Sequence, residues 1–180
     1  MLRPSSFFPC PAFRLALIAG LLAGCGAGSS LEPPAEPSIG ARIEQLERSG
    51  ALPTLDRSES LEGPDANGNL VRDDIEQWIA TQALTLAQQN AAVQFARAIQ
   101  LTLLVDTGDP QALQRSGDRT MGAISCIFDR FDETRSASGL VRKVEAITMN
   151  TRARVMRYIA YNKARSGSVT ILKNEDTCEP

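Results

Sequence analysis

The 180-residue chain contains no histidine. This absence excludes catalytic triads built on histidine, HExxH zinc sites and acid–base chemistry by an imidazole. A catalytic mechanism would have to rely on carboxylate, lysine, tyrosine or serine side chains alone. We therefore expect a protein that is not an enzyme, and we propose no catalytic residue.

An excess of positive charge is also missing, since 19 lysine and arginine residues stand against 21 aspartate and glutamate residues. Proteins that bind nucleic acid through its phosphates usually carry a clear basic excess. No nucleic-acid partner is expected.

The chain lacks an apolar run long enough to cross a bilayer as a helix. Its longest apolar stretch, Leu15 to Ala23, follows Arg3 and Arg14 and ends in small residues. A positive start, a short apolar centre and a small-residue end are typical of a secretory signal peptide. We predict that residues 1–24 are this signal and are removed.

Cys25 directly follows Leu22-Ala23-Gly24, and this stretch resembles the lipobox of bacterial lipoproteins. The resemblance implies that Cys25 becomes the mature N-terminus and carries a diacylglycerol and an amide-linked acyl chain such as palmitate. Several acyl chains anchor a protein stably, because each buried CH₂ contributes about 0.8 kcal/mol. Gly26, rather than an aspartate, follows this cysteine. By resemblance to the sorting of lipoproteins in Gram-negative bacteria, this implies a location at the periplasmic face of the outer membrane. The alternative is an ordinary signal peptide with a chance cysteine.

Residues 25–40 are rich in glycine and proline, which predicts a flexible tether behind the lipidated cysteine. Proline-rich segments extend by about 3.1 Å per residue, so the tether would hold a domain some 40–50 Å from the bilayer. Residues 41–180 are then expected to form the folded domain, and a short amphipathic helix is expected over Ile39–Arg48.

Helical spacing of apolar residues and few strand signals predict an all-α small helical bundle of about three long helices. The first is expected from Asp73 to Val105. The second is expected to begin at the Asp109-Pro110 cap and to weaken at Gly117 and Gly122. A third would follow a polar loop over 132–139 and run over 140–165, with Val155, Tyr158 and Ile159 facing inward. Residues 169–172 are expected to form a short strand or an extended tail.

Two cysteines remain for the folded domain, because Cys10 leaves with the signal and Cys25 would be lipidated. An even pair in an exported protein indicates one disulfide, between Cys126 and Cys178. A pair of free redox-active thiols is the alternative, although the CxxC spacing is missing.

Residues 65–76 place oxygen-bearing groups at alternate positions, and this segment resembles EF-hand and dockerin-like calcium loops. The ligand set implied by loop positions 1, 3, 5, 7, 9 and 12 comprises Asp65, Asn67, Asn69, the backbone carbonyl of Val71, Asp73 and Glu76. Calcium takes six to eight hard oxygens, which alternate residues of a curled loop supply.

Leu70 occupies the sixth loop position, where the pattern has glycine, and no second loop is present to pair with. A left-handed non-glycine residue costs about 1–2 kcal/mol. Three interpretations therefore remain: a calcium site, an Asn/Gly turn followed by acidic residues that suit a helix N-terminus, and a site for another metal.

The chain looks like a loose group of small bacterial lipoproteins with this loop, which have no activity to transfer. The segment 140–166 carries seven basic residues and one acid, Glu145. It is either a surface for anionic lipid, lipopolysaccharide or an acidic partner, or a solvated face partly neutralised by Asp73, Asp74 and Glu76.

Three functions compete. The leading one is a lipid-anchored cell-envelope protein, a non-enzymatic binding or structural module stabilised by one calcium ion, whose partner is an envelope protein or polymer. The second is a periplasmic hydrolase that uses carboxylates. The third is a weak calcium-responsive sensor, since an unpaired loop is expected to bind at about 10⁻⁴–10⁻³ M.

Overall fold

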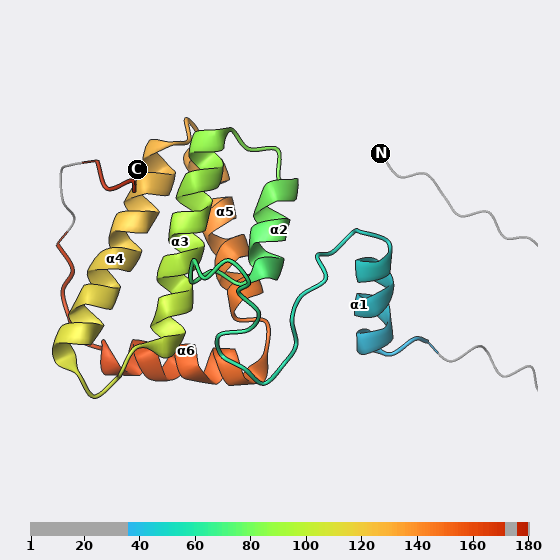
Figure 1. Ribbon diagram of the computed structural model, residues 1–180, viewed down its shortest axis with the longest axis horizontal. Coiled ribbons are helices and arrows are strands. Elements are labelled where there is room, and N and C mark those ends of the chain that lie inside the picture. The colour runs from blue at the N-terminus through green and yellow to red at the C-terminus, as the bar shows by residue number, and fades with distance from the viewer. Residues whose placement is uncertain (1–35, 172–175, 180) are drawn as a thin grey trace, which may run out of the picture. The chain divides into compact units, whose positions relative to one another are not determined.

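A computed structural model describes residues 36–171 and 176–179 of the chain, and residues from Pro37 onward belong to one compact unit. The predicted signal peptide, the lipobox, most of the tether and Leu172 lie outside the described residues. Within the described ranges the fold is all-helical, as predicted, and contains no strand (Figure 1). The six described helices are α1 Ile39–Arg48, α2 Asp73–Thr81, α3 Leu86–Leu104, α4 Pro110–Asp129, α5 Thr134–Thr148 and α6 Arg152–Ala164.

The prediction of about three long helices was wrong, because two of those helices are each divided in two. The expected helix over 73–105 ends at Thr81, and Gln82 takes an extended conformation with ψ 144°. Thr85 then begins α3 with a capping box, in which its side chain and that of Gln88 satisfy each other's backbone N–H groups. No glycine or proline marks this break, so the apolar spacing alone did not reveal it.

The expected helix over 140–165 is divided at Asn150, and the expected polar loop 132–139 already contains the start of α5 at Thr134. Thr151 caps α6 by accepting a hydrogen bond from the backbone N–H of Arg154 at 3.3 Å. A threonine oxygen near the middle of a helical pattern thus starts a new helix.

The helix α4 begins as predicted, with the Asp109 side chain accepting hydrogen bonds from the backbone of Gln111 and Ala112. It is continuous through both glycines. At Gly117 an added Cβ would lie 2.1 Å from the guanidinium of Arg165, so this glycine makes room for a side chain of the segment after α6.

The core is built around α3, which packs against α2, α4, α5 and α6. Ten of its residues are buried: Ala91, Ala92, Gln94, Phe95, Ala96, Ala98, Ile99, Gln100, Thr102 and Leu103. The only tryptophan, Trp78, packs partly buried against this core. By contrast, α1 buries no residue.

A disulfide joins Cys126 of α4 to Cys178 in the C-terminal segment, as predicted. The two cysteines are 52 residues apart, for which loop-closure entropy gives about 4 kcal/mol of stabilisation. None of the described helices has the length and apolar character that crossing a bilayer requires.

Candidate functional site

The segment 65–76 curls around the side chain of its first residue. The two carboxylate oxygens of Asp65 accept hydrogen bonds from the backbone N–H groups of Asn69 at 3.1 Å and of Leu70 at 2.8 Å. A single side chain therefore fixes the middle of the loop to its start.

The asparagines at loop positions 3 and 5 face the glutamate at position 12. Their side-chain oxygens accept backbone hydrogen bonds, Asn67 from Asn69 at 3.0 Å and Asn69 from Val71 at 2.9 Å. Their amide nitrogens donate to the two oxygens of Glu76, from Asn67 at 3.0 Å and from Asn69 over a short contact. Three of the six expected ligand residues thus converge on one point.

Asp73 closes the loop at the first turn of α2. Its carboxylate accepts a hydrogen bond from the backbone of Ala66 at 3.0 Å, and its own N–H donates to the carbonyl of Pro64 at 2.9 Å. The Val71 side chain is fully buried in the core, which ties the seventh loop position to the bundle. The structure therefore brings all six expected residues into one closed turn.

Leu70 adopts φ +66°, the only positive φ of a non-glycine residue among those described. This is the conformation for which glycine is favoured at the sixth position of such loops. The leucine side chain points into open surroundings, with 48% of its surface exposed. The loop therefore keeps its sharp turn despite the residue change.

The donor set suits a hard cation, because carboxylate and amide oxygens are the ligands that calcium takes. In residues 36–171 and 176–179, no three carboxylate or thiol groups gather closely enough to form a metal site by themselves. Asparagine oxygens would complete the shell. In the structure the oxygens of Asn67 and Asn69 face backbone N–H groups and their nitrogens face Glu76, so binding a cation would require these two side chains to rotate.

A buried arginine fixes the loop to α5. The side chain of Arg72 is fully buried, and its guanidinium donates to both carboxylate oxygens of Asp74 at 2.9 and 2.8 Å. It also donates to the carbonyls of Ile147 and Thr148, each at 3.1 Å, in the last turn of α5. A cation that satisfies helix C-terminal carbonyls is favourable, so Arg72 holds the loop against the end of this helix.

Arg154 of α6 forms the second part of this network. Its guanidinium, fully buried, lies 2.6 Å from Asp56 Oδ2 and also donates to the Asp56 carbonyl and to Asn150 Oδ1, both at 2.8 Å. The hydrogen bond from Arg154 lowers the pKa of Asp56 from 3.8 to about 2. Asn150 also accepts a hydrogen bond from Arg72 at 3.2 Å, so the two arginines share one asparagine.

A third arginine reaches the loop from α3. Arg97 donates through Nε to the Asn69 carbonyl at 2.8 Å, and its guanidinium also pairs with Glu179 of the C-terminal segment. The loop is thus held by α3 as well as by α5, and both contacts are made by arginine side chains.

Sequence reasoning missed these arginines. One interpretation of the basic segment was a solvated face partly neutralised by acids of the first helix, but Arg154 is buried and pairs with Asp56. Arg157 instead donates to the carbonyls of Leu103 and Val105 at the end of α3, and Arg165 to the Leu113 carbonyl. The only available signal was a long basic segment with a single acid, and it did not show which of its members are buried.

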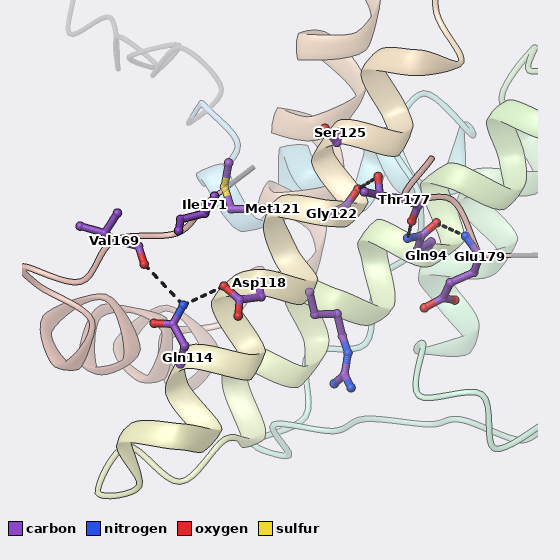
Figure 2. Close-up of a pocket in the computed structure, with 11 residues that line it drawn as sticks. Gln94, Gln114, Asp118, Met121, Gly122, Ser125, Val169, Ile171, Thr177 and Glu179 are labelled. Atoms are coloured by element: carbon purple, nitrogen blue, oxygen red, sulfur yellow. Dashed lines mark hydrogen bonds between the residues drawn. The ribbon is translucent and has the colours of Figure 1, made fainter. Parts of the chain in front are cut away.

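A hollow lies between α4 and the C-terminal segment, a cavity of about 620 Å³ (Figure 2). At one side of it, Gln114 donates to Asp118 at 2.8 Å and to the Val169 carbonyl at 3.4 Å. At the other, Gln94 donates to the Thr177 carbonyl at 2.8 Å. These contacts hold the C-terminal segment against α3 and α4.

Comparisons of the chain with protein-family profiles, with curated proteins and with solved structures returned no match. The site must therefore be interpreted from its own geometry.

Proposed function

We propose that this protein is a lipid-anchored component of the bacterial cell envelope, in which a helical domain serves as a non-enzymatic binding or structural module. One calcium ion, bound by residues 65–76, stabilises the entry into α2. The acyl chains on Cys25 hold the domain at the periplasmic face of the outer membrane, where it contacts an envelope protein or polymer.

The observation that carries the calcium proposal is the convergence of the loop on Glu76. The side chains of Asn67 and Asn69 reach the two oxygens of that carboxylate, while Asp65 fixes the turn from inside. A glutamate at the last position can offer both carboxylate oxygens, and the side chains gathered beside it from earlier positions carry further oxygens, which together suit the coordination number of calcium.

Static support is favoured over signalling by the way the loop is attached. Arg72 fixes it to the end of α5 and Arg97 fixes it to α3. A sensor needs an element with two arrangements that the ion can shift, whereas these contacts hold one arrangement. We therefore propose that calcium adds stability without moving a helix.

Thermal unfolding of the chain from residue 25 onward, with Cys25→Ser, tests the calcium proposal in excess calcium and in EDTA. At a calcium concentration 100 times the dissociation constant, the folded state should gain about 2.7 kcal/mol. Glu76→Gln should abolish this gain, because it keeps the side-chain length and removes the bidentate carboxylate. Equal melting temperatures in calcium and in EDTA, for the protein with an unchanged loop, would contradict the proposal.

The control variant is Glu59→Gln, which removes an exposed carboxylate outside the loop and should keep the full calcium response. Asp65→Ala is less informative. Because Asp65 accepts two backbone hydrogen bonds, its loss would destabilise the loop with or without calcium.

The anchor is tested separately by mass spectrometry of the protein from cell membranes. The N-terminal fragment should begin at Cys25 and carry the mass of the acyl chains, and Cys25→Ser should release the protein from the membrane fraction. An unmodified mature N-terminus at any other position would contradict the lipid anchor. Cross-linking in intact cells would then identify the envelope partner.

A further inference from the structure

The helix α6 buries its polar side and exposes an aliphatic one. Its two buried residues are Arg154 and Tyr161. Val155, Met156 and Ile159 are exposed over 39%, 55% and 52% of their surfaces. The prediction that Val155 and Ile159 face inward was therefore wrong. Exposed aliphatic residues grouped on one helix face often mark an interaction site.

Two arginines explain this orientation. Arg154 is fully buried against Asp56 and Asn150, and Arg157 donates to two carbonyls at the C-terminal end of α3. Successive residues of a helix are rotated by about 100°. Once these guanidinium groups face the bundle, the side chains of Met156 and Ile159 must face away from it.

Charge of one sign surrounds the exposed aliphatic residues. Arg152 and Lys163 are exposed near the two ends of α6, and the helix contains no acidic residue. We call these five residues the α6 outer face: Arg152, Val155, Met156, Ile159 and Lys163. In Figure 1, α6 lies across the ends of α3 and α4, so this face is at one end of the bundle.

The acidic side chains that contact α6 are bound to other residues of the helix. Glu145 accepts a hydrogen bond from Tyr158 at 3.0 Å, and Asp56 pairs with the buried Arg154. The α6 outer face itself therefore carries two cations and no anion.

We propose that the α6 outer face docks on the anionic phospholipid surface of the membrane that holds the anchor. This proposal rests on the proposed lipid anchor. Aliphatic side chains flanked by lysine and arginine are the chemistry by which a helix lies in a bilayer interface, with the cations near the headgroups. A symmetric contact between two copies would instead place the cations of one α6 near those of the other.

The length of the tether is compatible with a lipid membrane as the partner of the α6 outer face. Eleven positions separate Cys25 from Glu36, where the described residues begin, and an extended chain spans at most about 3.3–3.6 Å per residue. Full extension of this chain sets the largest separation of the domain from the bilayer, and a less extended chain lets the domain reach the lipid surface. Weak lipid binding by the α6 outer face is sufficient there, because tethering raises the effective concentration of this face at the membrane.

Flotation with lipid vesicles tests the face without the anchor, using the chain from residue 25 onward with Cys25→Ser. We expect it to bind vesicles of phosphatidylcholine mixed with phosphatidylglycerol, and to bind pure phosphatidylcholine vesicles far more weakly. Arg152→Gln and Lys163→Gln should each lower the partition coefficient by about fivefold. Met156→Ser with Ile159→Ser should lower it by about tenfold or more.

The matched control is Leu86→Ser, since Leu86 is 74% exposed at the start of α3, away from the α6 outer face. Its vesicle binding should equal that of the parent. Circular dichroism melts establish that each variant is folded. No binding to anionic vesicles by the folded parent, or equal binding by the Met156/Ile159 variant, would overturn the proposal.

Sedimentation velocity separates a second copy from lipid as the occupant. A dimer that Ile159→Ser dissociates would overturn docking on lipid, and a monomer supports it. The anchor is judged independently by the mass of the N-terminal fragment. Vesicle binding by a chain that is not acylated in cells would support the face while contradicting the anchor.

Discussion

The helices α3 and α6 lie in contact within one domain and are positioned by different forces. Ten of the nineteen residues of α3 are buried, and most of them are aliphatic, aromatic or alanine. Only two of the thirteen residues of α6 are buried, and one is an arginine. Apolar burial positions α3, whereas the hydrogen bonds and charges of arginine side chains position α6.

Apolar burial and buried arginine contacts differ in how strongly their contribution to stability depends on specific partners. Burying an aliphatic side chain stabilises the fold by about 1.5–3 kcal/mol with little dependence on its exact neighbours. A buried guanidinium is favourable only when its partners are in place, and it is strongly destabilising when they are lost. In Arg154 one donor, Nε, has no hydrogen-bond partner among the described residues. The position of α6 therefore depends on a few specific contacts.

The largest effect is expected for Arg154→Ala, which leaves the partly buried Asp56 carboxylate without its partner. We expect a loss of about 3–5 kcal/mol in the free energy of unfolding, measured by urea denaturation. Combining Arg154→Met with Asp56→Asn should recover much of this loss, since no charge is then left unpaired. A loss below about 1 kcal/mol for Arg154→Ala would mean that α6 is held by apolar contacts after all.

A smaller effect is expected from acid. The pKa of Asp56 is lowered from 3.8 to about 2 in the folded protein, and the hydrogen bond from Arg154 is the largest cause. The folded state therefore gains stability from this group above pH 3.8, and loses that gain as the pH falls toward 2. Urea denaturation at pH 5, 4, 3 and about 2 measures this loss.

Asp56→Asn provides the comparison for the acid experiment, because it removes the titrating group. This variant should be less stable at neutral pH and should show a shallower decrease between pH 4 and 2. An unchanged slope would assign the acid sensitivity to other carboxylates.

The smallest effects come from a matched pair of substitutions on the two helices. Ile99→Val trims a side chain of α3 that is 1% exposed and should cost about 1 kcal/mol. Ile159→Val makes the same change on α6 at a side chain that is 52% exposed, and should cost less than about 0.5 kcal/mol. Equal losses of stability for the two variants in thermal melts would show that apolar burial contributes as much to the position of α6 as to that of α3.

The same contrast explains what sequence could predict. Helical class, the helix Ile39–Arg48, the Asp109 cap and the disulfide all follow from local patterns, and the structure contains each of them. The loop 65–76 was also visible as a spacing of oxygen-bearing residues. These features depend on neighbours in sequence or on a simple count of cysteines.

The features that sequence did not predict depend on partners far apart in the chain. Arg72 and Asn150 are 78 residues apart, and Arg154 and Asp56 are 98 residues apart. A prediction from the apolar pattern places arginine side chains at the surface. It therefore assigned the wrong side of α6 to the core, and it predicted α5 and α6 as one continuous helix. Only the three-dimensional contacts reveal that the polar side is the buried one.

Gly63 has a consequence for the history of this fold. It takes φ +70°, and a Cβ added there would lie 2.4 Å from Cδ of Arg72. A side chain at position 63 and a buried arginine at position 72 therefore exclude each other. In related sequences we expect the two residues to be inherited together, so that a lineage which loses the glycine also loses the arginine and the loop attachment that it makes.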